Sequence, residues 1–488
     1  MRPCAAACRP QITVVAGHHL RPPDTTALVM TLRLALARGT ALAAAAFLGL
    51  AAPAASQAPG ANSADSILMA EIRRVRAVDN HAHPPKLVGA GERDEEFDAL
   101  PCDPLEPTPA GLMTRPENPQ YLAAWKALWG YPYDDRAPAH VQAVLAAKAR
   151  ARAAHGDDYP SWVLGRIGID VELSNRVAMG RGLDDAHHRW VPFDDALLFP
   201  LDNSPLAAQT PDRTFFFSRE DALRARYLKA LGLGALPPTL ADYVSQVVTP
   251  TLEGQKRQGA AAIKFEAAYL RSLDFGPATA DDAAAVYARY ARGGVPDTAQ
   301  YRHLQDYLFR YMAAQAGRLG LPVHIHTGAG CGGYFFLAGA NPLLLEPVLN
   351  DATLRKTTFV LLHGGAVSYT PAVAYLVMKP NVYADLSQQT WMESPRHLAE
   401  TLRYWLEWFP EKILFGTDLS PGGSPAIDWE EIGWQTNETA RRALGLALTG
   451  MMRDGAITRA QAVVFARGVL RDNAARLYRL EGSGALTP

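Results

Sequence analysis

Short apolar segments alternate with longer amphipathic segments along most of the chain. Residues 321–326 (LPVHIH) and 358–363 (TFVLLH) are too short for typical helices and are almost wholly apolar. By contrast, residues 301–319 and 395–409 carry apolar side chains at three- and four-residue intervals, which is typical of amphipathic helices. Apolar strands that alternate with such helices form parallel sheets covered on both faces. The pattern therefore predicts an α/β fold.

The number of apolar segments favours a barrel. Eight segments fit strands, namely residues 75–83, 171–173, 196–201, 260–264, 321–326, 358–363, 381–386 and 413–418. The spacing of the later segments fits barrel units of roughly 30 residues. We therefore predict a (β/α)8 TIM-type barrel within residues 59–480. Residues from about 84 to 160 exceed the length that the first unit needs, so we expect them to form a helical cap inserted after the first strand.

Several of these strands end in residues that can carry chemistry. They are His81 and His83 after the first strand, followed by Lys264, His326, His363 and Asp418 after later ones. The two histidines at 81 and 83 share one side of a strand, because side chains alternate with a period of two. The carboxyl ends of barrel strands converge on one rim, and imidazole suits zinc and its neighbours. A metal site is favoured over scattered structural histidines because so many strands end this way.

These motifs resemble a known family. HAHP after the first strand, HTG after the fifth, HGG after the sixth and FGTD after the eighth resemble the amidohydrolase superfamily of metal-dependent (β/α)8 barrels, of the amidohydrolase 2 type. The stretches HTGAGCGGYFFLAGANPLLLEPVL, AIKFEAAYLR and LRDNAARLYRL are similar to the amidohydrolase-like domain that some fungal and plant proteins fuse to a glutamine-synthetase-like domain. The resemblance covers roughly residues 75–480.

The resemblance implies a metal-dependent hydrolase that acts on an amide or similar C–N bond of a small molecule, other than a peptide bond. His81, His83 and Asp418 would bind a divalent metal, zinc above all, and His326 would complete the site or bind a second ion. Asp418 would also take a proton from the metal-activated water and return it to the leaving group. His363, counted among the metal ligands as well, would polarise the substrate or the developing oxyanion.

Lys264 has several interpretations. The resemblance implies that a lysine after the fourth strand can be carboxylated and bridge two metals, whereas an unmodified ammonium would repel the ions and bind a substrate carboxylate instead. A third interpretation pairs Lys264 with Glu266, or makes Glu266 the bridging ligand. Arg271 is a weaker candidate for binding a substrate carboxylate, with a solvated surface arginine as the alternative. His324 is expected to lie behind the ligands or to line the barrel.

Composition narrows the class of protein. The 488 residues include 48 Lys+Arg and 49 Asp+Glu, a formal net charge of −1, so no basic field exists to attract nucleic acid. Four cysteines are too few for a disulfide scaffold. Cys102 and Cys331 could nevertheless pair in an exported protein. A small-molecule substrate is therefore expected, while a monomer and a homo-oligomer both stay open.

The first 58 residues read as a secretory signal. From Met30, two arginines precede an apolar run over about 41–52 and then a small-residue cleavage site ending at Ala58. The apolar run is too short for a permanent membrane span. We expect residues 1–58 to be removed, with Met30 as the real start, residues 481–488 to form a tail, and the protein to be periplasmic or secreted.

Two other functions stay open. Related barrels with the same residue types also catalyse decarboxylation or isomerisation, and the site residues barely distinguish these reactions from hydrolysis. A non-catalytic periplasmic binding protein with a relic metal site is the third hypothesis. The complete set of candidate ligands argues against it, because a relic should have lost at least one ligand.

Overall fold

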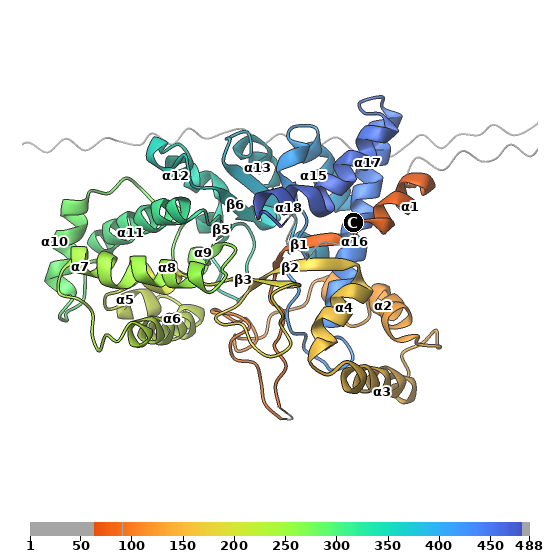
Figure 1. Ribbon diagram of the computed structural model, residues 1–488, viewed down its shortest axis with the longest axis horizontal. Coiled ribbons are helices and arrows are strands. Elements are labelled where there is room, and N and C mark those ends of the chain that lie inside the picture. Colours follow the sequence, from red (N-terminus) through yellow and green to blue (C-terminus); the bar gives the residue numbers. More distant parts are fainter. Residues whose placement is uncertain (1–62, 90, 481–488) are drawn as a thin grey trace, which may run out of the picture. The chain divides into compact units, whose positions relative to one another are not determined.

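The computed structural model describes residues 63–89 and 91–480 (Figure 1). The predicted signal segment and the predicted tail lie outside these residues. Parallel strands form two sheets in the orders β1-β2-β3 and β4-β5-β6-β7-β8. The strands are β1 (Ala77–Ala82), β2 (Ile169–Asn175), β3 (His188–Val191), β4 (Ile263–Phe265), β5 (Val323–His326), β6 (Phe359–Leu362), β7 (Val382–Asp385) and β8 (Ile413–Leu414).

Backbone hydrogen bonds join the two sheets at both seams. Between β3 and β4, the amide of Lys264 donates to the carbonyl of Pro192 at 2.8 Å. Between β8 and β1, the amide of Asn80 donates to the carbonyl of Phe415 at 2.8 Å. Successive strands thus follow one another around a parallel α/β barrel, and the predicted (β/α)8 TIM-type fold is confirmed.

The third strand lies elsewhere than predicted. Residues 196–201 are wholly buried, but they form the end of the 3₁₀ helix η3 (Asp195–Leu197) and the turn after it. The strand that pairs with β2 is β3, in which Arg189 and Trp190 are only half buried. The prediction was wrong because a short buried apolar run cannot be assigned to a strand by periodicity alone.

The insertion between β1 and β2 becomes helical only in its second part. It contains η1 (Leu112–Thr114), α2 (Pro119–Trp129), α3 (Pro138–His155), η2 (Gly156–Asp158) and α4 (Tyr159–Ile167). Helices α2 and α4 contact α16 (Trp429–Arg453), the long helix after β8. The ammonium of Lys148 on α3 lies 3.0 Å from the Glu430 carboxylate and 2.8 Å from that of Glu431 at the start of α16. Buried ion pairs therefore attach this cap to the segment that follows β8.

The remaining helices connect the other strands. Helix α1 (Ser66–Arg74) precedes β1. Between β3 and β5 lie α5 (Ser204–Ala207), α6 (Pro211–Ala230), α7 (Leu240–Tyr243), the π-helix η4 (Val244–Val248), α8 (Thr249–Arg257), α9 (Ala267–Leu270), α10 (Ala280–Tyr290) and α11 (Thr298–Leu319). Between β5 and β7 lie η5 (Leu337–Ala340), η6 (Pro342–Leu345), α12 (Glu346–Leu349), η7 (Ala352–Leu354), η8 (His363–Gly365) and α13 (Thr370–Leu376). After β7 come α14 (Gln389–Met392), α15 (Pro395–Leu406), η9 (Pro410–Lys412), α17 (Arg459–Arg467), the π-helix η10 (Gly468–Asp472) and α18 (Asn473–Leu477). None of the described helices combines the length and apolar composition needed to cross a membrane.

The core follows the alternation of side chains along the strands. In β6, Phe359 and Leu361 belong to the large apolar cluster that includes the helices, whereas Val360 and Leu362 belong to a smaller cluster with Val78 of β1. Side chains of opposite parity thus face the helices or the barrel interior. The barrel interior below the strand ends is therefore lined by apolar side chains, and the polar residues at the strand ends lie above them.

Candidate metal centre

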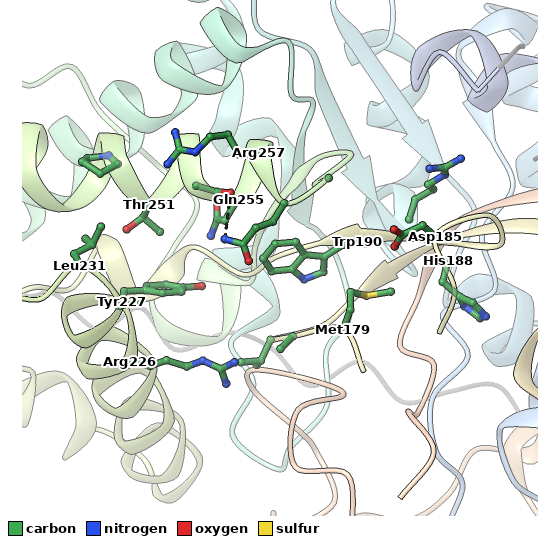
Figure 2. A pocket seen from close by; sticks show the side chains of 18 residues that line it. Met179, Asp185, His188, Trp190, Arg226, Tyr227, Leu231, Thr251, Gln255 and Arg257 are labelled. Atoms are coloured by element: carbon green, nitrogen blue, oxygen red, sulfur yellow. Dashed lines mark hydrogen bonds between the residues drawn. The ribbon is translucent and has the colours of Figure 1, made fainter. Parts of the chain in front are cut away.

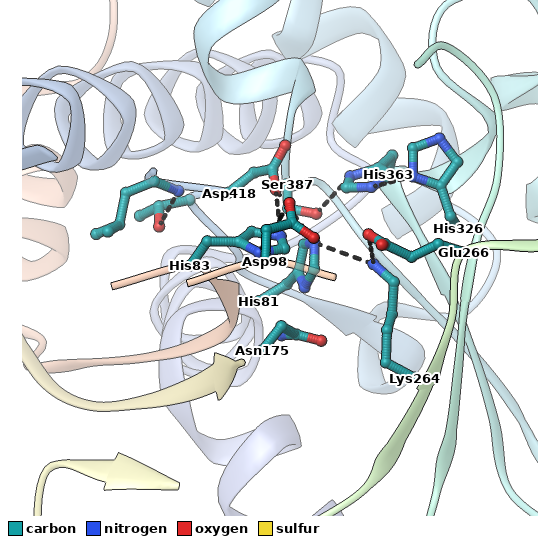
Figure 3. A network of polar contacts seen from close by, with 12 residues as sticks. His81, His83, Asp98, Asn175, Lys264, Glu266, His326, His363, Ser387 and Asp418 are labelled. Carbon is teal, nitrogen blue, oxygen red and sulfur yellow. Dashed lines mark hydrogen bonds and ion pairs between the residues drawn. The ribbon is translucent and has the colours of Figure 1, made fainter. Parts of the chain in front are cut away.

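Three of the predicted ligands converge where β1 and β8 end (Figure 3). Nε2 of His81 lies 3.1 Å from Oδ1 of Asp418, and Nε2 of His83 lies 3.6 Å from the same oxygen. One donor atom from each of the three residues lies within 4.8 Å of the other two. A single cation could therefore contact all three side chains, which we call the three-donor group.

The backbone fixes this convergence. Ala82, between the two histidines, packs into the cluster on the helix side of the strand, so His81 and His83 both point the other way. Asp418 adopts a left-handed conformation (φ 56°), which aspartate tolerates better than most residues. Its amide donates to the carbonyl of His81 at 2.8 Å. The ligand carboxylate is thus tied by its own backbone to the strand of the ligand histidines.

A buried carboxylate below the three-donor group holds both segments in place. Asp79 accepts hydrogen bonds from the amide and the hydroxyl of Thr417, at 2.9 and 2.5 Å, and from the amide of His81 at 3.2 Å. Burial raises the pKa of Asp79 well above its ordinary value, and nearby Glu172 raises it further. These bonds position the backbone of His81 and the residue immediately before Asp418.

The protonation of the two histidines suits metal binding. Burial, with the charge of Lys264, lowers the pKa of His81 well below its ordinary value. Burial also lowers the pKa of His83 to about 4, although Asp98 acts in the opposite direction. Both imidazoles are therefore neutral at pH 7, the form that binds metals. Two neutral imidazoles and a carboxylate are a donor set that zinc accepts, so the residues fit a divalent metal.

Lys264 lies between the three-donor group and Glu266. Its ammonium is 3.4 Å from Nε2 of His81 and 3.6 Å from Oε1 of Glu266, and its side chain is fully buried. The Lys264–Glu266 ion pair, one of the three interpretations of Lys264, is thus present. A positive charge so close to His81 opposes a cation at the same nitrogen. Lys264 must therefore lose its charge or move away from His81 before a metal binds.

His326 and His363 form a pair beside the three-donor group. Nδ1 of His326 lies 3.1 Å from Nε2 of His363, and the ring centres of His363 and His81 are 5.1 Å apart. The prediction placed both histidines in the ligand set, yet the structure does not bring them into the three-donor group. The reason is that their nitrogens are hydrogen-bonded to each other and to neighbouring groups.

The hydrogen bonds of His326 and His363 determine which ring nitrogens carry a proton. Nε2 of His326 lies 2.9 Å from the carbonyl of Ala329, which can only accept, so that nitrogen carries a proton. Burial lowers the pKa values of His326 and His363 well below their ordinary range, so each ring carries one proton. His363 therefore donates through Nε2 to His326, while its Nδ1 lies 2.9 Å from the Ser387 hydroxyl, which donates to Asp385 at 2.7 Å. His363 is thus a neutral donor beside the metal ligands.

The predicted residue His324 lies behind the ligands, inside the barrel. Its Nε2 is 2.7 Å from the hydroxyl of Tyr478, which in turn donates to the side-chain oxygen of Asn80 at 2.5 Å. The amide group of Asn80 donates to Asp385 at 2.7 Å, and Asp385 also accepts from the backbone of His363. His324 therefore contacts the hydrogen-bond network beneath the site and not the three-donor group.

Arg271 is not brought to the site residues. Its guanidinium is buried, lies 2.7 Å from the carboxylate of Asp306, and donates to Gln305 at 3.0 Å. It also lies 4.3 Å from the centre of the Phe275 ring. Neither expectation for Arg271 holds, because a guanidinium paired inside the protein is neither a free carboxylate ligand nor a solvated surface group.

A family model matches the larger part of the chain. The model of the family described as amidohydrolase matches residues 184–480. The chain belongs to the amidohydrolase family. Because the match begins after β2, His81 and His83 are placed at the site by the structure rather than by the family match. A search of curated proteins finds no match.

Solved structures support the fold of this amidohydrolase. It is similar to a candidate metal-dependent hydrolase from Lactobacillus casei, with a TM-score of 0.53 and 15% identity over 86% of this chain and 99% of that chain. It is also similar to a uronate isomerase from Thermotoga maritima (0.50, 13% identity, 84% and 96%). A glucuronate isomerase from Caulobacter crescentus gives 0.50 and 12% identity over 86% and 94%. The fold is thus shared by proteins named as hydrolases and as isomerases.

One acidic residue of the amidohydrolase site was not predicted from the sequence. Oδ2 of Asp98 lies 3.5 Å from Nδ1 of His83. Asp98, Glu266 and His83 also offer donor atoms within 4.8 Å of one another. Asp98 lies in an irregular part of the insertion after β1, so neither periodicity nor a strand end marks it. Its sole signal was its place in the segment expected to cover the barrel.

A disulfide links two loops of the amidohydrolase barrel. Cys102, in the insertion after β1, is bonded to Cys331, in the loop after β5, with 6.1 Å between their Cα atoms. The pairing that the sequence left open is therefore present in the structure. It holds the first part of the insertion to the loop that follows β5 of the five-stranded sheet.

Two cavities differ in their relation to the metal centre. The larger, of about 610 Å³, lies beside β3 and is lined by residues such as Trp190, Tyr227 and Gln255 (Figure 2). None of the candidate metal ligands lines it. A smaller cavity of about 380 Å³ reaches Asp418 and is lined by residues of the cap and of the loop after β8. The smaller cavity is therefore the one connected to the candidate chemistry.

Proposed function

We propose that this amidohydrolase-family protein is a metal-dependent hydrolase that cleaves an amide or similar C–N bond of a small molecule. The observation that carries the proposal is the three-donor group of His81, His83 and Asp418 on a barrel of this family. Zinc is the metal we expect, because two imidazoles and a carboxylate are among its known ligand sets in hydrolases.

The chemistry requires a proton acceptor beside the metal. A divalent metal supplies Lewis acidity, which lowers the pKa of water and polarises a carbonyl. Asp418 takes the proton of the attacking water at its carboxylate and returns it to the leaving nitrogen. Burial raises the pKa of Asp418 to about 8, with Asp385 and Asp98 raising it further and Lys264 opposing them. A divalent metal bound to this carboxyl would favour its ionised form, which is the form that accepts the proton.

His363 supports the developing negative charge. Its neutral ring carries a proton on Nε2, as its contact with His326 requires. We propose that it donates this hydrogen bond to the substrate oxygen once substrate is bound. Before substrate binds, His326 accepts this hydrogen bond and keeps the His363 ring in position.

Lys264 is proposed to act in an uncharged or carboxylated form. Its ammonium lies only 3.4 Å from the ligand nitrogen of His81, and a carbamate would replace that positive charge with a negative one. Activity of metal-loaded protein should then rise when bicarbonate is added and fall when it is removed. Independence from bicarbonate, together with full metal loading, would argue for the uncharged amine.

We also propose that the protein is exported. The signal pattern of residues 1–58 supports this, and so does the Cys102–Cys331 disulfide, because disulfides persist in oxidising compartments. Determination of the mature N-terminus after expression tests the proposal. A new terminus close to residue 59 is expected, whereas an intact N-terminus in a reduced cytoplasmic fraction would contradict it.

The hydrolase proposal is tested with metal-stripped protein that is reloaded with Zn²⁺. We expect it to hydrolyse members of a panel of N-acyl and γ-glutamyl amides, to lose this activity with a chelator, and to regain it with Zn²⁺. Conversion of a hexuronate without amide hydrolysis would instead favour an isomerase, the activity named for two structures with this fold. No turnover and no bound metal would favour a binding protein.

A further inference from the structure

The cavity that reaches Asp418 is largely apolar. Its large side chains are Tyr121 from the cap, Trp391 from α14, and Ile427 and Ile432 from the loop and helix after β8. Its volume of about 380 Å³ falls within the range of small-molecule sites. The cap and the segment after β8 therefore enclose a space large enough for an aromatic ring.

The residues described as lining this cavity include no cationic side chain that could pair with an anion. Among the described residues that line it, Asp418 is the only charged one, and it is acidic. Arg136 lies nearby, but its guanidinium donates to the backbone carbonyls of Pro116 and Asn118. Burying a carboxylate without a hydrogen-bonded cation is unfavourable. The cavity therefore disfavours an acidic substrate group.

The position of Asp418 indicates which part of a substrate enters. In the proposed reaction, Asp418 returns its proton to the leaving nitrogen, so that nitrogen and its substituent lie next to this carboxylate. Asp418 is also the residue that the cavity shares with the three-donor group. The substituent on the leaving nitrogen is thus directed into the apolar cavity.

From these observations we propose the substrate class: N-acyl derivatives of an amine that carries an uncharged, apolar group of about the size of an aromatic ring. This inference rests on the proposed hydrolase function. Tyr121, Trp391, Ile427 and Ile432 are the residues that determine specificity for the amine. A uronate, with a carboxylate and several hydroxyls, does not match this cavity.

Three matched amides test the inference on Zn²⁺-loaded protein. They are N-benzylacetamide, N-methylacetamide, and N-acetyl-4-(aminomethyl)benzoate, which adds a carboxylate to the ring of the first. We expect kcat/KM for N-benzylacetamide to exceed that for N-methylacetamide by about 10- to 100-fold, the gain from burying a ring. The benzoate should be hydrolysed at least about tenfold more slowly than N-benzylacetamide. Release of the amines is measured by chromatography.

Two variants link this preference to the cavity. Ile432→Ala should reduce the ratio of the rates for the benzyl and methyl amides about fivefold, because it removes apolar contact area. Ile427→Lys should raise the rate for the benzoate relative to N-benzylacetamide about tenfold, because it adds the missing cation. The control is Val464→Ala, an exposed position on α17, which should leave both ratios unchanged.

The outcomes separate this inference from the function on which it rests. Hydrolysis of the benzoate as fast as N-benzylacetamide, or an unchanged ratio in Ile432→Ala, overturns the substrate class and leaves the hydrolase standing. If no amide is hydrolysed at any metal loading, the hydrolase proposal fails. In that case, calorimetric titration still measures the preference of the cavity. Tighter binding of N-benzylacetamide than of the benzoate, weakened in Ile432→Ala, supports an apolar preference. Equal binding of the two compounds overturns that preference.

Discussion

Oδ1 of Asp418 lies 3.1 Å from Nε2 of His81, although the two residues belong to the last and the first strand units of the barrel. The amide of Asp418 also donates to the carbonyl of His81. The seam between β8 and β1 is therefore both a structural contact and the place where the candidate ligands meet. A change at either residue should affect metal binding before it affects the fold.

The ligand set can be tested by His81→Ala and Asp418→Asn. His81→Ala should lower the metal content of purified protein, because one of three donors is lost. Asp418→Asn should lower turnover about 100- to 10,000-fold, because an amide cannot accept the proton of the attacking water. Elemental analysis and amide turnover measure these effects. His187→Ala, a half-exposed histidine paired with Asp184, is the control and should leave both values unchanged.

Asp98 is expected to orient His83. A carboxylate beside the second nitrogen of a metal-binding histidine fixes the ring, and losing such a partner typically lowers metal affinity about 10- to 100-fold. Asp98→Asn should therefore weaken zinc binding by that factor in competition with a chromogenic chelator. Asp103→Asn, on the same insertion and exposed, should not. Equal zinc affinity in the two variants would show that Asp98 does not act on His83.

The disulfide should stabilise the loops above the barrel. Replacing both Cys102 and Cys331 by serine should lower the free energy of unfolding by about 2–5 kcal/mol, the typical effect of removing a native disulfide. Urea unfolding measures the change. Reductant should destabilise the natural protein by a similar amount and leave the double variant unaffected. A reductant effect on the double variant would point to another cause.

Asp194 should make stability depend on pH. Burial raises its pKa to about 8, with Asp195 adding to the shift and a hydrogen bond from Gln255 opposing it. Between about pH 4 and pH 8 the folded protein keeps this proton while the unfolded chain releases it. The free energy of unfolding should therefore fall as pH rises through this window, by up to about 1.4 kcal/mol per unit.

The variant Asp194→Asn isolates this contribution. In metal-free protein, its stability relative to the natural sequence should be higher at pH 8 than at pH 5, because the amide has no proton to lose. Urea unfolding at pH 5, 6.5 and 8 gives the comparison. Parallel pH profiles for the two proteins would contradict the raised pKa.

Much of the fold was predictable because it depends on local periodicity. Seven of the eight predicted segments overlap strands of the barrel, and the exception, residues 196–201, forms the end of η3 and a buried turn instead. The displaced strand, β3, is only half buried at its centre and so lacked an apolar signal. An apolar run in the sequence indicates a strand correctly where the buried residues are also the ones that pair. It gives a wrong prediction where buried residues do not pair, as at 196–201, or where paired residues are half buried, as in β3.

The sequence by itself determined which chemistry-bearing residues end strands, and that His81 and His83 share one side, because a period of two is a property of an extended backbone. Tertiary structure alone decided how these strand ends meet. It placed Asp98 against His83 from an irregular segment, paired His326 with His363, and buried Arg271 against Asp306. Such contacts join residues far apart in the chain, and their geometry depends on how loops and helices pack, which no local pattern records.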